Sequence, residues 1–133
     1  MLIEFLGTGG AIATPVPGLM DPLNVKARTL GVPYSRFGPC LFVHGPNLLI
    51  DTPEEARLAL DRAGIAHVPN CIYSHWHPDH VLGRRIFELN RDWGKWPDHP
   101  FCTQVYLPQQ VALDARDHQG LYETLSFHQS KGL

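Results

Sequence analysis

Short apolar runs separated by glycine and proline predict a chain of alternating strands and helices. Five segments have the length and apolar content of strands: residues 1–6, 39–44, 47–51, 70–74 and 104–107. Three further segments have helical patterns: residues 53–63, 80–90 and 108–128. Gly45 and Pro46 join the second and third strands as a hairpin, whereas helices separate the later strands. The pattern therefore predicts an α/β fold with a mixed sheet and flanking helices.

The ends of the first two helices carry specific signals. Thr52, Pro53 and Glu55 form the sequence of a capping box, with Thr52 as the cap and Pro53 at the first helical position. Gly64 is expected to end this helix. In the second helix one face is predicted to be buried, and its residues are Leu82, Ile86 and Leu89.

Residues 14–38 are predicted to form a long irregular loop. They include four prolines and several scattered glycines: Pro15, Pro17, Pro22 and Pro33 are the prolines. The whole chain of 133 residues, 44% of them hydrophobic, is large enough for one core, so we expect a single domain over residues 1–133.

Composition excludes several classes of protein. The formal net charge of −2 and the near-neutral pI argue against a broad nucleic-acid-binding surface, which needs clustered Lys and Arg. No leader and no long apolar run stand in the sequence, so we expect a soluble, cytoplasmic protein without a membrane segment. Cys40 and Cys71 lie in apolar runs and are expected to be small buried residues in a reducing compartment.

Residues 75–80 carry the strongest chemical signal, the sequence H-W-H-P-D-H. With 8 His in the chain, the pattern H-x-H-x-D-H is expected by chance only about 0.002 times. Imidazole and carboxylate are ligands that zinc, manganese and iron accept. The motif lies between a predicted strand and a predicted helix, which is a rigid place for a metal site. A histidine-rich loop without function is the weaker alternative.

This motif after a strand resembles the signature of the metallo-β-lactamase superfamily of hydrolases. The turn at residues 7–10 (G-T-G-G) and the strand that ends in Asp51 resemble its phosphodiesterase and ribonuclease-Z-like branch. The resemblance covers most of residues 1–107 and implies the N-terminal half of an αβ/βα sandwich. The family's other ligands would follow downstream, and neither His118 nor His128 has their context. No cysteine stands where relatives hold a structural zinc.

The resemblance also implies a role for each site residue. His75 and His77 would bind one metal ion, while Asp79 and His80 would bind its neighbour, with two zinc ions in a complete site and manganese or iron possible. Asp51 would orient a ligand imidazole or the water; the alternative is a carboxylate that only accepts from local backbone amides. Asp79 could also accept a proton from the attacking water. Ser74 is not expected to face the site, because adjacent residues on a strand point to opposite faces.

The leading hypothesis is therefore a metal-dependent hydrolase that activates water and acts on a small phosphodiester or cyclic phosphate. A β-lactam or thioester substrate would use the same chemistry, and trimming of transfer RNA is less favoured because the chain is acidic. The alternative is a non-catalytic metal-binding half-domain, or a fragment that needs a partner chain to complete its site. Since a half-sandwich exposes the face that its other half would cover, a homo-oligomer is also expected.

Overall fold

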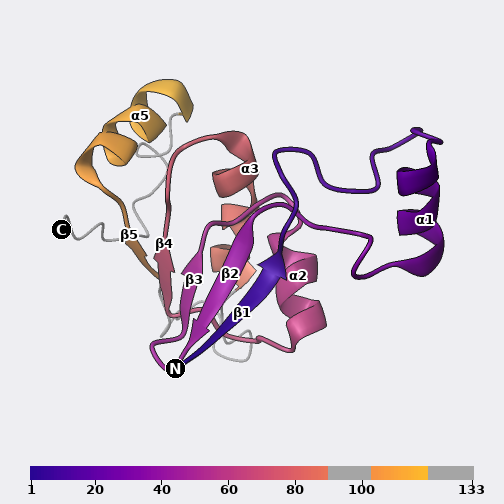
Figure 1. Cartoon of the computed structure of the whole chain (residues 1–133). Coiled ribbons are helices and arrows are strands. Elements are labelled where there is room, and N and C mark those ends of the chain that lie inside the picture. Colours follow the sequence, from indigo (N-terminus) through magenta and orange to yellow (C-terminus); the bar gives the residue numbers. More distant parts are fainter. Residues whose placement is uncertain (90–102, 120–133) are drawn as a thin grey trace.

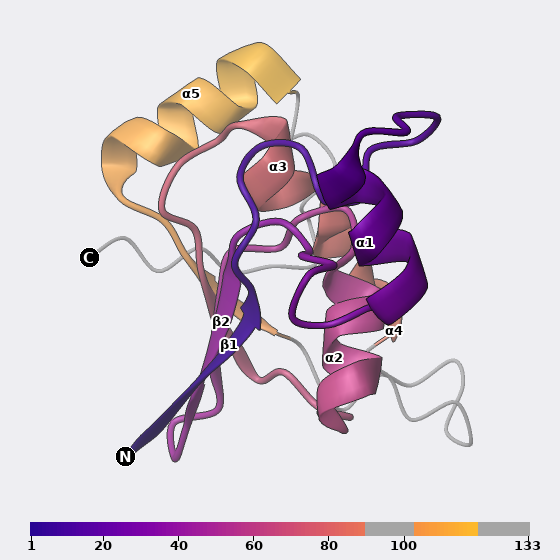
Figure 2. The ribbon, with the colours of Figure 1, turned by 45° about the vertical axis from the view of Figure 1, so that its right-hand side comes forward.

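The protein forms one mixed five-stranded sheet with helices packed on one face (Figures 1 and 2). The computed structural model describes residues 1–89 and 103–119. In sheet order the strands are β1 (Leu2–Gly7), β2 (Cys40–His44), β3 (Leu48–Ile50), β4 (Asn70–Ile72) and β5 (Gln104–Tyr106). The first three strands run antiparallel and the last three run parallel. The predicted α/β fold, mixed sheet and hairpin are confirmed.

The helices that follow residue 50 cover one face of this sheet (Figure 2), whereas the helix within residues 14–38 stands to one side of it (Figure 1). In chain order the helical elements are α1 (Pro22–Leu30), α2 (Ala56–Ala63), α3 (Pro78–Val81), the 3-10 turn η1 (Leu82–Arg85), α4 (Ile86–Leu89) and α5 (Gln109–Gln119). Alternate strand residues point to these helices and form the core, namely Leu6, Phe42, Leu49, Cys71 and Val105. No described helix is long and apolar enough to cross a membrane.

The other residues of the strands form a second face, which we name the open sheet face. Its members pair across the sheet: Ile3, Phe5, Leu41, Val43, Leu48, Ile50, Asn70, Ile72, Gln104 and Tyr106. All except Asn70 and Gln104 are apolar or aromatic, and none belongs to the core cluster under the helices. At the β1 edge Phe5 is 69% exposed and Ile3 is 47% exposed. Both faces of the sheet are therefore mainly apolar, although the described helices cover only one.

The segment 14–38 is not irregular throughout, because α1 lies within it. Asp21 caps this helix, since its side chain accepts from the backbone N–H groups of Leu23 and Asn24, and Pro22 takes the first turn. The side-chain amide of Asn24 also donates to Asp21, and this contact, followed by the backbone amides, lowers the pKa of Asp21. The proline content led to the prediction of a loop, although Asp21 and Pro22 are typical of a helix start.

The predicted start of α2 is also wrong. This helix begins at Ala56, and Glu55 before it makes no capping bond with its side chain. Thr52 is fully buried, and its hydroxyl lies 2.9 Å from the hydroxyl of Tyr73. Its backbone N–H donates to the carbonyl of His80 at 2.7 Å. Because Thr52 makes these contacts with the chain after β4, it does not cap the helix.

The predicted helix over residues 80–90 is broken into short pieces, and its buried face differs. Leu82 is 46% exposed, whereas Val81 and Phe87 are buried together with Ile86. Gly83 approaches the segment before α2 closely: its N–H donates to the carbonyl of Thr52 at 2.8 Å. A Cβ at Gly83 would lie 2.0 Å from the carbonyl oxygen of Pro53, so this contact sets the path of the chain.

Cys40 and Cys71 are free thiols in the core, as the sequence predicted. Burial, with a smaller effect of the Asp51 charge, raises the pKa of Cys40 to about 12. Burial likewise raises the pKa of Cys71. Both thiols are therefore unreactive packing residues. Cys102 lies outside the described residues.

Candidate metal centre

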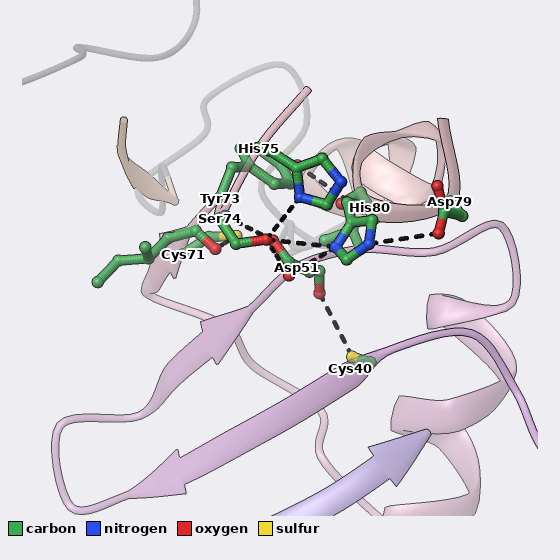
Figure 3. A network of polar contacts seen from close by, with 10 residues as sticks. Cys40, Asp51, Cys71, Tyr73, Ser74, His75, Asp79 and His80 are labelled. Carbon is green, nitrogen blue, oxygen red and sulfur yellow. Dashed lines mark hydrogen bonds and ion pairs between the residues drawn. The ribbon is translucent and has the colours of Figure 1, made fainter. Parts of the chain in front are cut away.

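The candidate site lies at the carboxyl ends of the parallel strands β3 and β4 (Figure 3). Asp51 follows β3, and the ligand loop follows β4. The backbone N–H of Asp51 donates to the carbonyl of Ile72 at 3.0 Å, which extends the pairing of the two strands by one bond. Parallel pairing thus brings Asp51 beside Ser74, although 23 residues separate them along the chain.

Asp51 is the buried centre of the hydrogen-bond network, with 6% of its surface exposed. Its Oδ1 accepts from the backbone N–H of Ser74 at 2.7 Å. Its Oδ2 lies 2.7 Å from Ser74 Oγ and 2.8 Å from His80 Nδ1. Local backbone amides therefore account for only part of its contacts, and the carboxylate is in place to orient His80. Its role in a reaction stays a prediction.

His80 lies between two carboxylates. Its Nδ1 contacts Asp51, and its Nε2 lies 3.3 Å from Oδ2 of Asp79. Two ligand atoms bound to one tetrahedral zinc ion at about 2.1 Å lie about 3.4 Å apart. The spacing of Nε2 and Oδ2 therefore fits a pair of ligands on one ion. The same distance also suits an ion pair, so the pairing of Asp79 with His80 on one ion stays a prediction.

His75 and His77 lie close to this pair. The ring centroid of His75 is 3.8 Å from that of His80 and 4.7 Å from that of His77. Partial burial, followed by the neighbouring rings of His80 and His77, lowers the pKa of His75. A lowered pKa favours the neutral imidazole, which is the form that binds metal. The motif therefore brings its imidazoles close together, with His75 favoured in the neutral form.

The described residues do not complete a metal site. Among them no group of three or more His, Cys, Asp or Glu side chains is arranged to hold one ion. Zinc normally takes four ligands, and the motif offers two for each ion. The donor atoms fit the expected metals in kind and, for Asp79 and His80, in spacing. Binding of zinc, manganese or iron by His75, His77, Asp79 and His80 stays a prediction.

Ser74 is the residue that sequence reasoning missed. Since β4 ends at Ile72, Ser74 lies beyond the strand and the alternation of faces does not apply to it. Its Oγ lies 2.7 Å from Asp51 Oδ2, 3.0 Å from His75 Nδ1 and 3.3 Å from His80 Nδ1. A shorter strand prediction would have placed a hydroxyl inside the site.

Comparison with family models and with curated proteins gives no match to this chain. Solved structures do match it. A diphosphatase from the PhnP family is 19% identical with a TM-score of 0.72, and zinc-bound PqqB from Methylobacterium extorquens is 13% identical with a TM-score of 0.71. Human tRNase Z, short form, is 17% identical with a TM-score of 0.56. The chain has the fold of half a metallo-β-lactamase protein.

The matched regions show how much of that fold is present. Each match covers 98% of this chain but only 50%, 48% and 44% of the three solved chains, in the order above. The chain thus spans about half the length of the structures it matches. At these identities the likeness establishes the metallo-β-lactamase half-fold, which the sequence motif had predicted, and not an activity.

The glycine turn of residues 7–10 and His118 make packing contacts in this half-fold. The glycine turn of residues 7–10 packs against the backbone of residues 36–38: a Cβ at Gly9 would lie 2.6 Å from the carbonyl oxygen of Phe37. This contact gives the glycine turn a packing role. His118 is exposed and stacks on Trp76, with ring centroids 4.6 Å apart. His128 lies outside the described residues.

Proposed function

We propose that the chain provides one side of a two-metal site in a hydrolase that acts on phosphodiesters or cyclic phosphates. The observation that carries this proposal is the position of His80, held by Asp51 on one nitrogen and facing Asp79 with the other at 3.3 Å. The fold shared with a diphosphatase and with a zinc-bound protein supports it.

Each residue of the site would have a defined task. His75 and His77 would hold one ion, and Asp79 and His80 its neighbour. Such ions, when bound, lower the pKa of water and stabilise negative charge on the reacting oxygens. Asp51 would be a positioning residue, because its carboxylate contacts Ser74 and His80. Asp79 is the catalytic candidate, since its carboxylate would accept a proton from the attacking water.

Metal content and hydrolysis together test this proposal. The chain is loaded with zinc or manganese and assayed on a simple phosphodiester, an ester and a β-lactam. His77→Ala removes a candidate ligand, and His67→Ala is the matched control, because His67 is exposed on the segment between α2 and β4. We expect His77→Ala to lower metal content and turnover, and His67→Ala to preserve both. Bound metal without hydrolysis of any substrate would count against the hydrolase.

The open sheet face favours a second candidate, a half-domain that completes its site by pairing with a second copy. The face is apolar except at Asn70 and Gln104, and Phe5 at its edge is 69% exposed. The solved structures that the chain matches are about twice its length, so each holds a further region of similar size. A second copy would bring a region of that size to the open sheet face. It would also bring further ligands to a site that has only two for each ion.

The oligomeric state distinguishes this candidate. Phe5→Glu places a charge on the open sheet face, whereas Leu58→Glu alters a residue of α2 that is 46% exposed and lies outside it. We expect a concentration-dependent dimer that Phe5→Glu abolishes and Leu58→Glu retains, measured by sedimentation or light scattering. A chain that stays monomeric at the highest attainable concentration excludes pairing with a second copy.

A further inference from the structure

Ser74 Oγ meets three polar groups at once, and it has a single proton to give. The neighbours are Asp51 Oδ2 at 2.7 Å, His75 Nδ1 at 3.0 Å and His80 Nδ1 at 3.3 Å. A serine hydroxyl donates once and accepts through two lone pairs, whereas an ionised carboxylate only accepts. The short contact with Asp51 therefore takes the hydroxyl proton.

This proton assignment decides the state of both imidazoles. Because the hydroxyl donates to Asp51, its contact with His75 requires a proton on Nδ1 of His75. Nδ1 of His80 faces two acceptors, Asp51 Oδ2 at 2.8 Å and Ser74 Oγ at 3.3 Å, so it too carries a proton. In a neutral imidazole the other nitrogen then has a free lone pair.

We propose that Ser74, together with Asp51, is a positioning residue that fixes His75 and His80 as Nδ1–H tautomers and leaves their Nε2 atoms as the metal ligands. The inference deepens the proposed function, on which its metal-binding part rests. It also accounts for the pair at His80: a bare Nε2 faces Asp79 Oδ2 at 3.3 Å, and two electron-pair donors at that distance attract a cation between them.

The tautomers can be read directly in the metal-free chain. Long-range ¹H–¹⁵N correlation spectra of histidine-labelled protein at a pH of about 9, well above the usual imidazole pKa, distinguish protonated from bare ring nitrogens. We expect Nδ1–H at His75 and His80. Ser74→Ala should release His75 into a mixture of tautomers and leave His80 fixed by Asp51, while Ser74→Thr should restore His75.

Zinc affinity, measured by competition with a chelating dye, gives the second readout. We expect Ser74→Ala to weaken binding about 10–100-fold, and Ser74→Thr to stay near the unchanged chain. Nε2–H at His75 or His80 in the unchanged chain overturns the proposal, even if Ser74→Ala does not fold. A His75 that keeps Nδ1–H in a folded Ser74→Ala protein also overturns it. The expected tautomers without zinc binding support the proton assignment and remove the proposed hydrolase instead.

Discussion

Asp51→Asn is the most informative single change, because it alters the donors and acceptors of the network and little else. Asn tolerates the left-handed backbone of Asp51, whose φ is 63°. Its amide oxygen can keep the bond from the backbone N–H of Ser74, and its NH₂ then faces Ser74 Oγ and His80 Nδ1. Ser74 must accept from this amide and turn its proton to His75. Both His75 and His80 are thereby driven to the Nε2–H tautomer.

The expected loss of stability follows from the bonds that Asp51 accepts, from Ser74 N, Ser74 Oγ and His80 Nδ1. A bond to a charged group contributes about 1 kcal/mol more than a neutral one, so three bonds give a loss of about 3 kcal/mol. Asn avoids burying a charge, which offsets part of this loss. We therefore expect the free energy of unfolding to fall by about 1–3 kcal/mol. Zinc affinity should fall about 10–100-fold, because Nε2–H cannot bind metal.

Urea denaturation and zinc competition measure the two effects. Asp61→Asn is the matched control, because Asp61 is an exposed residue of α2, and it should shift stability by less than about 0.5 kcal/mol. The spectra of the metal-free Asp51→Asn chain should show His80 protonated at Nε2, where it can donate to Asp79. If Asp51→Asn matches the control in stability and zinc affinity, the network does not position His80, and the reasoning fails.

Three further predictions concern individual contacts of the fold. Gly83→Ala should destabilise the fold by about 1–3 kcal/mol in urea denaturation, because its Cβ would lie 2.0 Å from a backbone oxygen, whereas Gly10→Ala has open space and should have little effect. Thr52→Val should destabilise by about 1–3 kcal/mol because it removes the Thr52 hydroxyl that lies 2.9 Å from the buried hydroxyl of Tyr73; adding Tyr73→Phe should recover part of this loss in a double-mutant cycle. The cap of α1 should be intact above the unfolded pKa of Asp21, near 3.8, and lost as the pH falls through its lower folded pKa. An NMR titration of Asp21 with an ordinary midpoint would contradict this.

Local sequence patterns were sufficient to predict the sheet and the position of the ligand loop. The apolar runs over residues 39–44 and 47–51, with Gly45 and Pro46 between them, specify a hairpin on their own chemistry. The spacing of residues 75–80 likewise needs no tertiary contact to be noticed, and it predicted the half-fold that the structural comparisons show.

The sequence-based predictions are wrong where contacts with distant segments outweigh a local signal. Thr52 has the sequence of a helix cap, but its hydroxyl is used by Tyr73 and its backbone by His80. Leu82 has the spacing of a buried helical residue, yet Gly83 beside it must pack on the segment before α2, which turns Leu82 outward. The contact between Asp51 and His80 joins residues 29 positions apart, and only the parallel pairing of β3 and β4 creates it.

The backbone of Asp51 links the fold to the chemistry of the site. A left-handed φ is unfavourable for most side chains but is tolerated by Asp and Asn, whose short polar groups can bond locally. This conformation lets the chain turn directly after β3 while the side chain accepts from Ser74 and His80 at the end of β4. An alanine here would lose the carboxylate and add backbone strain, so its effect would mix two causes. Asn keeps the turn and replaces a charged acceptor with an amide donor, and a weakened zinc site in that variant would therefore report on the proton network.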